Sequence, residues 1–156
     1  METKKPTHTG RNIAIVVVII LLAAAGIYEI IPKSKTVSYN VLNSGTTITV
    51  APGQPVAYLI SLPPPPDPYT TIAYTLTGSF TATSDVAVYL VNSTSSDFSA
   101  FPTSYAYSSG NVTSGTISVG NLPVSNNYFL VIYNIGNSNT TVTITQPIIT
   151  SGTASG

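Results

Sequence analysis

Apolar residues are concentrated first in one run near the start of the chain, from Ile13 to Ile31, interrupted only by Tyr28 and Glu29. As an α-helix, these 19 residues would extend about 28 Å, close to the bilayer hydrocarbon thickness of about 30 Å. The pattern predicts a transmembrane helix over residues 13–31.

After Lys35 the pattern changes to short runs of β-branched and aromatic residues separated by Gly, Pro and Asn, with no helical periodicity. The regular spacing of these runs predicts an all-β domain, an antiparallel β-sandwich of jelly-roll or Ig-like form. The predicted strands are residues 37–42, 46–50, 56–62, 71–77, 79–83, 86–91, 105–108, 116–119, 128–134 and 140–145.

Turn-forming residues separate many of these runs. Asn43-Ser44-Gly45, Pro52-Gly53-Gln54-Pro55, Ser109-Gly110-Asn111 and Gly136-Asn137 each predict a turn. The proline-rich stretch 63–68 predicts a stiff connection, because proline lacks the amide that a strand interior needs. Residues 93–101 are expected to form one helical turn or a wide loop whose phenylalanines close the end of the sandwich.

Two of the predicted strands are apolar or aromatic on both faces, 86–91 and 128–134. Residues of one parity must fill the core, so the opposite parity faces outward. We therefore expect Tyr89 and either Ile132 or Tyr133 to lie on the outward face and to contact a partner. A loop or the membrane could instead cover that face, and tyrosine is also compatible with an uncharged outer surface.

The predicted organisation has five parts: a cytoplasmic tail (1–12), the transmembrane helix (13–31), a membrane-exit linker (32–35), an extracytoplasmic sandwich (36–146) and a flexible tail (147–156). The basic residues flanking the apolar run, Lys4, Lys5 and Arg11 before it and Lys33 and Lys35 after it, favour a cytoplasmic N-terminus only slightly. The polar composition of the long C-terminal part favours its export.

Two alternatives for the N-terminal segment remain open. A signal peptidase could cleave at the small residues 23–25, which would release the domain from its anchor. A pilin-type leader could be cut after Gly10, although Thr9 stands where such leaders usually carry a basic residue.

The chain contains unusually few charged residues. Charged residues make up 6% of the chain and hydrophobic residues 43%, and the only charged side chains after Lys35 are Asp67, Asp85 and Asp97. Enough apolar residues are present for a core, and few groups titrate in acid, so we expect a folded domain suited to the exterior of an acidophile. The absence of cysteine excludes disulfides, while Asn92, Asn111 and Asn139 begin candidate N-glycosylation sequons.

Residues 84–101 and 122–145 resemble segments of archaeal membrane-anchored, extracytoplasmic β-sandwiches related to the pre-peptidase C-terminal and GOLD-like domains. The first contains Asp85-Val86-Ala87-Val88-Tyr89-Leu90-Val91-Asn92, and the second resembles the closing hairpin of that family. Asn126 and Asn127 stand where the family has a glycine before the aromatic residue. The resemblance implies a noncatalytic accessory or recognition domain and assigns no site residues.

The sequence offers little for catalysis. His8, the only histidine, falls in the predicted cytoplasmic tail, so the outer domain has neither histidine nor cysteine for a metal, haem or thiol site. Three aspartates and no nearby base do not indicate a nucleophilic or paired-carboxylate enzyme, and no basic patch indicates nucleic-acid binding.

We therefore predict a single-pass cell-membrane protein that is not an enzyme, binds no cofactor, and serves as an accessory or structural subunit of a membrane or cell-surface complex. Its expected partners are membrane lipid, other membrane or surface proteins, and further copies of itself. The alternative is a pilin-like or strand-complemented filament or adhesion subunit, in which an extended strand such as residues 140–149 completes a neighbour's sheet.

Overall fold

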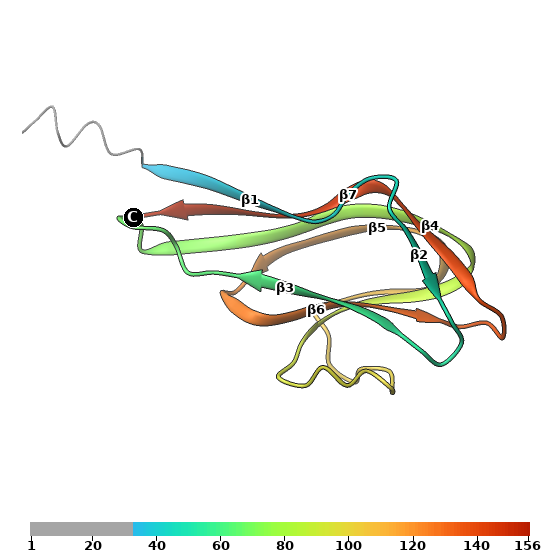
Figure 1. Cartoon of the computed structure of the whole chain (residues 1–156). Coiled ribbons are helices and arrows are strands. Elements are labelled where there is room, and N and C mark those ends of the chain that lie inside the picture. Colours follow the sequence, from blue (N-terminus) through green and yellow to red (C-terminus); the bar gives the residue numbers. More distant parts are fainter. Residues whose placement is uncertain (1–32) are drawn as a thin grey trace, which may run out of the picture. The chain divides into compact units, whose positions relative to one another are not determined.

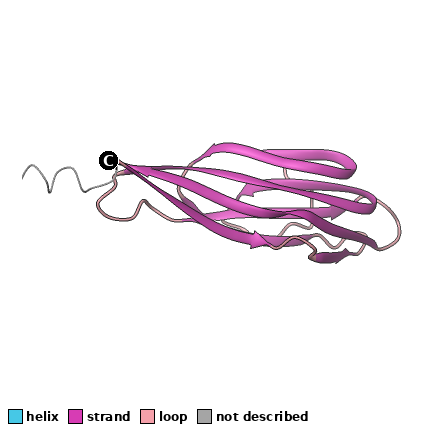
Figure 2. Ribbon diagram, turned by 90° about the horizontal axis from the view of Figure 1, so that it is seen from above, coloured by secondary structure: helices cyan, strands magenta, loops and turns pink. Residues whose placement is uncertain are grey.

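The computed structural model describes residues 33–156, which contain seven β-strands and no helix (Figures 1 and 2). The strands are β1 (Ser34–Leu42), β2 (Thr47–Val50), β3 (Val56–Leu62), β4 (Thr71–Asn92), β5 (Tyr107–Leu122), β6 (Ser125–Asn134) and β7 (Thr140–Ser155). The predicted cytoplasmic tail and transmembrane helix, together with both candidate cleavage positions, lie outside the described residues. Within residues 33–156, no helix has the length and apolar character needed to cross a membrane.

The strands form one antiparallel sheet in the order β1-β7-β4-β6-β3, with β2 paired to β7 and β5 paired to β4. Strand β4 changes its partner along its length. Residues 71–82 pair with β7, and residues 86–92 pair with β6. The sheet consequently curls, so that β1 and β7 lie across from β3 and β6 in Figure 1.

One large core fills the inside of this curl. It contains buried side chains from all seven strands, including Val50, Ile60, Leu90, Ile117 and Ile144. The predicted alternation in residues 140–145 is confirmed, since Val142 and Ile144 are buried and their polar neighbours are more exposed. Burying each such side chain contributes about 1.5–3 kcal/mol.

Tyr74 shows how an aromatic residue and a glycine pair across neighbouring strands. Its register partner is Gly152 on β7, and a Cβ added at Gly152 would lie 2.6 Å from the Tyr74 ring. The Tyr74 hydroxyl donates a hydrogen bond to the Pro63 carbonyl at 2.8 Å. Gly152 is therefore needed for close packing within the strand.

Several predicted strand breaks are absent because their glycines have this packing role or form bulges. The predicted strands 71–77, 79–83 and 86–91 are one strand, β4, in which a Cβ at Gly78 would lie 2.8 Å from Ile148 Cγ1. The predicted turn at 109–111 is a bulge in β5, where Ser109 Oγ accepts the Val88 amide and Gly110 has a φ of 65°. Residues 107–108 of the first predicted strand and the whole of predicted strand 116–119 thus belong to one strand, β5.

The strands continue past both predicted boundaries of the sandwich. Residues 147–155, expected in a flexible tail, continue β7 and pair with β1 on one side and β4 on the other. Ser34 and Lys35, expected in a linker, begin β1. The folded unit therefore extends from Ser34 to Gly156.

Candidate binding surface

The structure separates the three residues expected to face a partner. Tyr89 and Tyr133 lie on the face of β4 and β6 opposite the large core, as strand parity predicted. Ile132 belongs to the large core and is 1% exposed, so of the two alternatives Tyr133, not Ile132, lies on the outward face. The physical reason is the alternation itself, because Ile132 pairs with the core residue Val88 while Tyr133 pairs with Ala87.

The chain covers this outward face with its own loop, residues 93–106. Tyr89 makes edge-to-face contacts with Tyr105, Tyr133 and Phe101, at ring-centroid distances of 5.2, 5.7 and 6.2 Å. Phe98 is buried against Phe129, with ring centroids 5.0 Å apart. Phe98 and Phe101 were expected to close the end of the sandwich. Phe98 instead belongs to a second apolar cluster on the outer face, and Phe101, which is 53% exposed, contacts Tyr89 and Tyr133 there.

Short-range hydrogen bonds hold the loop in an irregular path that contains no helical turn. The amides of Ser95, Asp97 and Ser99 donate to the side chains of Ser93, Ser95 and Asp97, each two residues earlier. The bond from the Ser99 amide, followed by a contribution from its side chain, lowers the pKa of Asp97 because it favours the carboxylate. The Tyr133 hydroxyl donates to the Ala100 carbonyl at 2.8 Å and ties the loop to β6. The loop is thus part of the folded unit.

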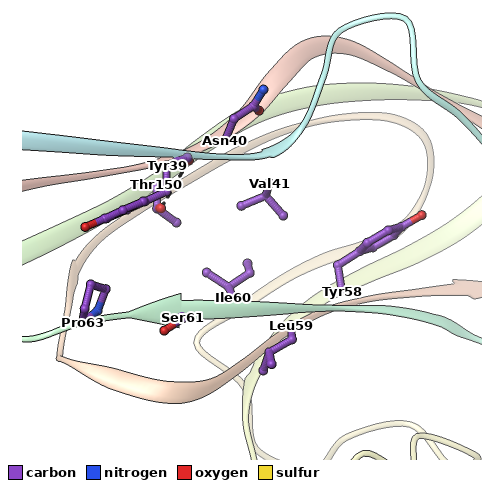
Figure 3. Close-up of a pocket in the computed structure, with 9 residues that line it drawn as sticks. All are labelled: Tyr39, Asn40, Val41, Tyr58, Leu59, Ile60, Ser61, Pro63 and Thr150. Atoms are coloured by element: carbon purple, nitrogen blue, oxygen red, sulfur yellow. Dashed lines mark hydrogen bonds between the residues drawn. The ribbon is translucent and has the colours of Figure 1, made fainter.

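A different apolar surface remains open between the two ends of the strand order. A groove of about 320 Å³ lies between β1 and β3, and Val41 and Ile60 point toward each other across it (Figure 3). Its lining residues are Tyr39, Asn40, Val41, Tyr58, Leu59, Ile60, Ser61, Pro63 and Thr150. Among the described residues, β1 pairs only with β7 and β3 only with β6, so each strand has one unpaired edge.

The groove combines apolar side chains with free main-chain groups and no formal charge. Tyr39 is 43% exposed and Leu59 is 60% exposed, the largest exposure among the exposed large hydrophobic residues. Burial raises the pKa of Tyr58, and burial with a smaller effect of Tyr39 raises the pKa of Tyr74 behind it. The Tyr58 and Tyr74 hydroxyls therefore stay protonated at neutral pH and add no charge to the groove.

Sequence reasoning did not find this groove. The uncharged run 56–62 lies between Pro55 and Pro63, a pattern typical of an edge strand. Which strand lies across from it depends on β1 pairing with β7, more than 100 residues away in the sequence. No local pattern carries that information.

The other candidate residues lie apart from the groove. Asn92, Asn111 and Asn139 are all exposed, with Asn92 Oδ1 accepting the Ser125 hydroxyl at 3.4 Å. The aspartates lie in three separate segments, the β3–β4 connection, β4 and the 93–106 loop. In residues 33–156, no three His, Cys, Asp or Glu residues gather as a metal site would require. A smaller hollow of about 300 Å³ lies between residues 53–55 and the loop.

Comparison with protein-family models finds no match for this chain, and a search of curated proteins finds none either.

Proposed function

We propose that this protein is a noncatalytic, single-pass membrane protein whose β-domain acts as an accessory or structural subunit of a membrane or cell-surface complex. The apolar run Ile13–Ile31 supplies the anchor, the N-terminus lies in the cytoplasm, and residues 33–156 lie outside. This arrangement follows from the sequence pattern.

The groove between β1 and β3 is the observation that supports this function best. It offers two unpaired strand edges beside apolar side chains, and strand edges are places where another chain adds main-chain hydrogen bonds. None of its nine lining residues carries a formal charge at neutral pH, and none is an Asp, Glu, His, Lys or Cys that could serve as a catalytic base near neutral pH. Such a surface supports a binding or assembly role.

We also propose a jelly-roll or Ig-like sandwich as the finer description of the curled sheet. The two layers enclosing one core support it, as does the resemblance to pre-peptidase C-terminal and GOLD-like domains. That resemblance implies an accessory domain, in agreement with the proposed role.

A filament or adhesion subunit is the second candidate, and the same unpaired edges favour it. The expected donor strand has to be revised, because residues 140–149 lie inside β7 with partners on both sides. This chain would therefore accept a strand at β1 or β3 rather than donate β7.

Extraction of the full-length protein in a mild detergent, followed by native mass spectrometry, tests the proposed function. We expect the chain to co-purify with bound protein subunits. Protease treatment of intact cells should remove an epitope placed after Gly156 and spare one placed before Met1. A chain that is always a single, partner-free polypeptide would contradict the accessory role, and an epitope pattern of the opposite kind would contradict the topology.

A further inference from the structure

We infer that the groove between β1 and β3 is the contact surface between two copies of this chain, related by a two-fold axis perpendicular to the sheet. This inference rests on the proposed function and names the partner that the groove binds. In such a dimer, β1 lies beside β1 of the second copy and β3 beside β3 of the second copy. Both pairs are antiparallel, because a two-fold axis perpendicular to a sheet reverses the direction of each strand.

The sequence of β3 is compatible with pairing to itself. In an antiparallel pair centred on Leu59, Tyr58 faces Ile60 of the second copy and Ala57 faces Ser61. The inward residues of each copy would continue the apolar floor of the groove across the axis. Leu59 would face its own copy on the outer side, which would bury the most exposed of the large hydrophobic side chains.

Charge does not oppose this contact. Strand β3 contains no charged residue and no proline, the two devices that commonly prevent edge strands from pairing. Strand β1 carries only Lys35, near its beginning and away from residues 39–41 that line the groove. A two-fold axis through the groove therefore places no two like charges opposite each other.

The area available is enough for a small specific interface. At about 3.3 Å per residue, β1 is roughly 30 Å long and β3 roughly 23 Å, and the two layers lie about 10 Å apart. With the side chains on either side, the contact would cover about 500 Å² on each copy, or about 1,000 Å² in total, the lower bound for specific interfaces. Copies tethered to one membrane meet at a raised effective concentration, so a modest interface is sufficient.

Cysteine crosslinking of the full-length protein in its membrane tests this contact directly, because the chain has no cysteine of its own. In the two-fold dimer, residue 59 faces residue 59 of the second copy at about 4.5–5.5 Å between Cα atoms, within the range of a disulfide. We expect Leu59→Cys to give a covalent dimer under mild oxidation. Val124→Cys is the matched control, since Val124 is also an exposed hydrophobic residue but is not among the groove's lining residues.

A charge at the same position should disrupt the dimer. Leu59→Lys places two like charges opposite each other, and we expect about a tenfold or greater weakening of association in native mass spectrometry, with an unchanged unfolding midpoint. Val124→Lys should leave association unchanged. Association that survives Leu59→Lys, or equal crosslinking at positions 59 and 124, would overturn the inference.

The same measurements separate this inference from the proposed function. If a different protein co-purifies and is lost on Leu59→Lys, the second-copy inference is wrong and the accessory role stands. If the wild-type chain carries no bound protein at all, both are wrong.

Discussion

Residues 33–156 have two apolar surfaces beyond the main core, and only one of them is covered by a loop of the chain. The outward face of β4 and β6 is covered by residues 93–106, which bring Phe98, Phe101 and Tyr105 onto it. The groove between β1 and β3 has no such cover among the described residues, and Leu59 beside it is 60% exposed. The covered face stabilises the fold, whereas the open groove is the surface that we propose for association. Each surface should therefore respond to mutation in its own way.

The largest difference in the free energy of unfolding is expected between two alanine substitutions, one on each surface. Phe98→Ala removes a buried aromatic ring from the covered face and should lower the free energy of unfolding by about 3 kcal/mol. Leu59→Ala, at the groove, should change it by about 0.5 kcal/mol or less, because the side chain is already mostly in water. Denaturant unfolding followed by circular dichroism measures both, and similar losses would abolish the distinction between the surfaces.

Tyr89 is the residue at which the structure changes our expectation from the sequence. Strand parity alone places Tyr89 against a partner, and on that interpretation Tyr89→Ser would release the partner and leave the domain folded. Because Tyr89 is half-buried under Phe101 and Tyr105, we now expect the substitution to cost about 2 kcal/mol of stability and to leave association unaffected. A variant with wild-type stability that no longer binds its partner would restore the original interpretation.

A single hydroxyl should produce a smaller effect. Tyr133→Phe removes the hydrogen bond to the Ala100 carbonyl and should cost about 1 kcal/mol, with faster proteolysis within residues 93–106. Tyr39→Phe, which removes a hydroxyl from the exposed groove, is the control and should change neither quantity. Equal effects at both positions would show that the loop is not held by this bond.

The contrast between the surfaces also explains what the sequence could and could not predict. Alternation and β-branched runs locate strands well, and predicted strand 56–62 coincides with β3. The apolar character of both faces of residues 128–134 correctly indicated that each face is covered. Both patterns depend on residues that are close together in the sequence, so the sequence alone reveals them.

The misjudged features depend on distant parts of the chain. Gly78 and Gly110 read as strand breaks because a turn, a bulge and a close packing contact all favour glycine, and only the neighbouring strand distinguishes them. Residues 147–155 looked like a tail because their strand has small residues at positions 152 and 154, where the chain passes tightly between β1 and β4. The groove itself required the full strand order.

The smallest expected effect concerns acid, and it again separates the two surfaces. Hydrogen bonding from Ser99 lowers the pKa of Asp97 in the folded chain, so this group favours the folded state above its unfolded pKa of about 3.9. That contribution is lost as pH falls through the lower folded pKa. The unfolding midpoint should accordingly stay nearly constant from neutral pH to about pH 4 and decline slightly below it, and Asp97→Asn should remove this part of the decline.

The groove contains no acidic residue, so crosslinking through Leu59→Cys, measured with a pH-independent oxidant, should be the same at pH 3 as at pH 7. A dimer that dissociates in acid while the 93–106 loop keeps its resistance to proteolysis would reverse the assignment of acid sensitivity to the covered face.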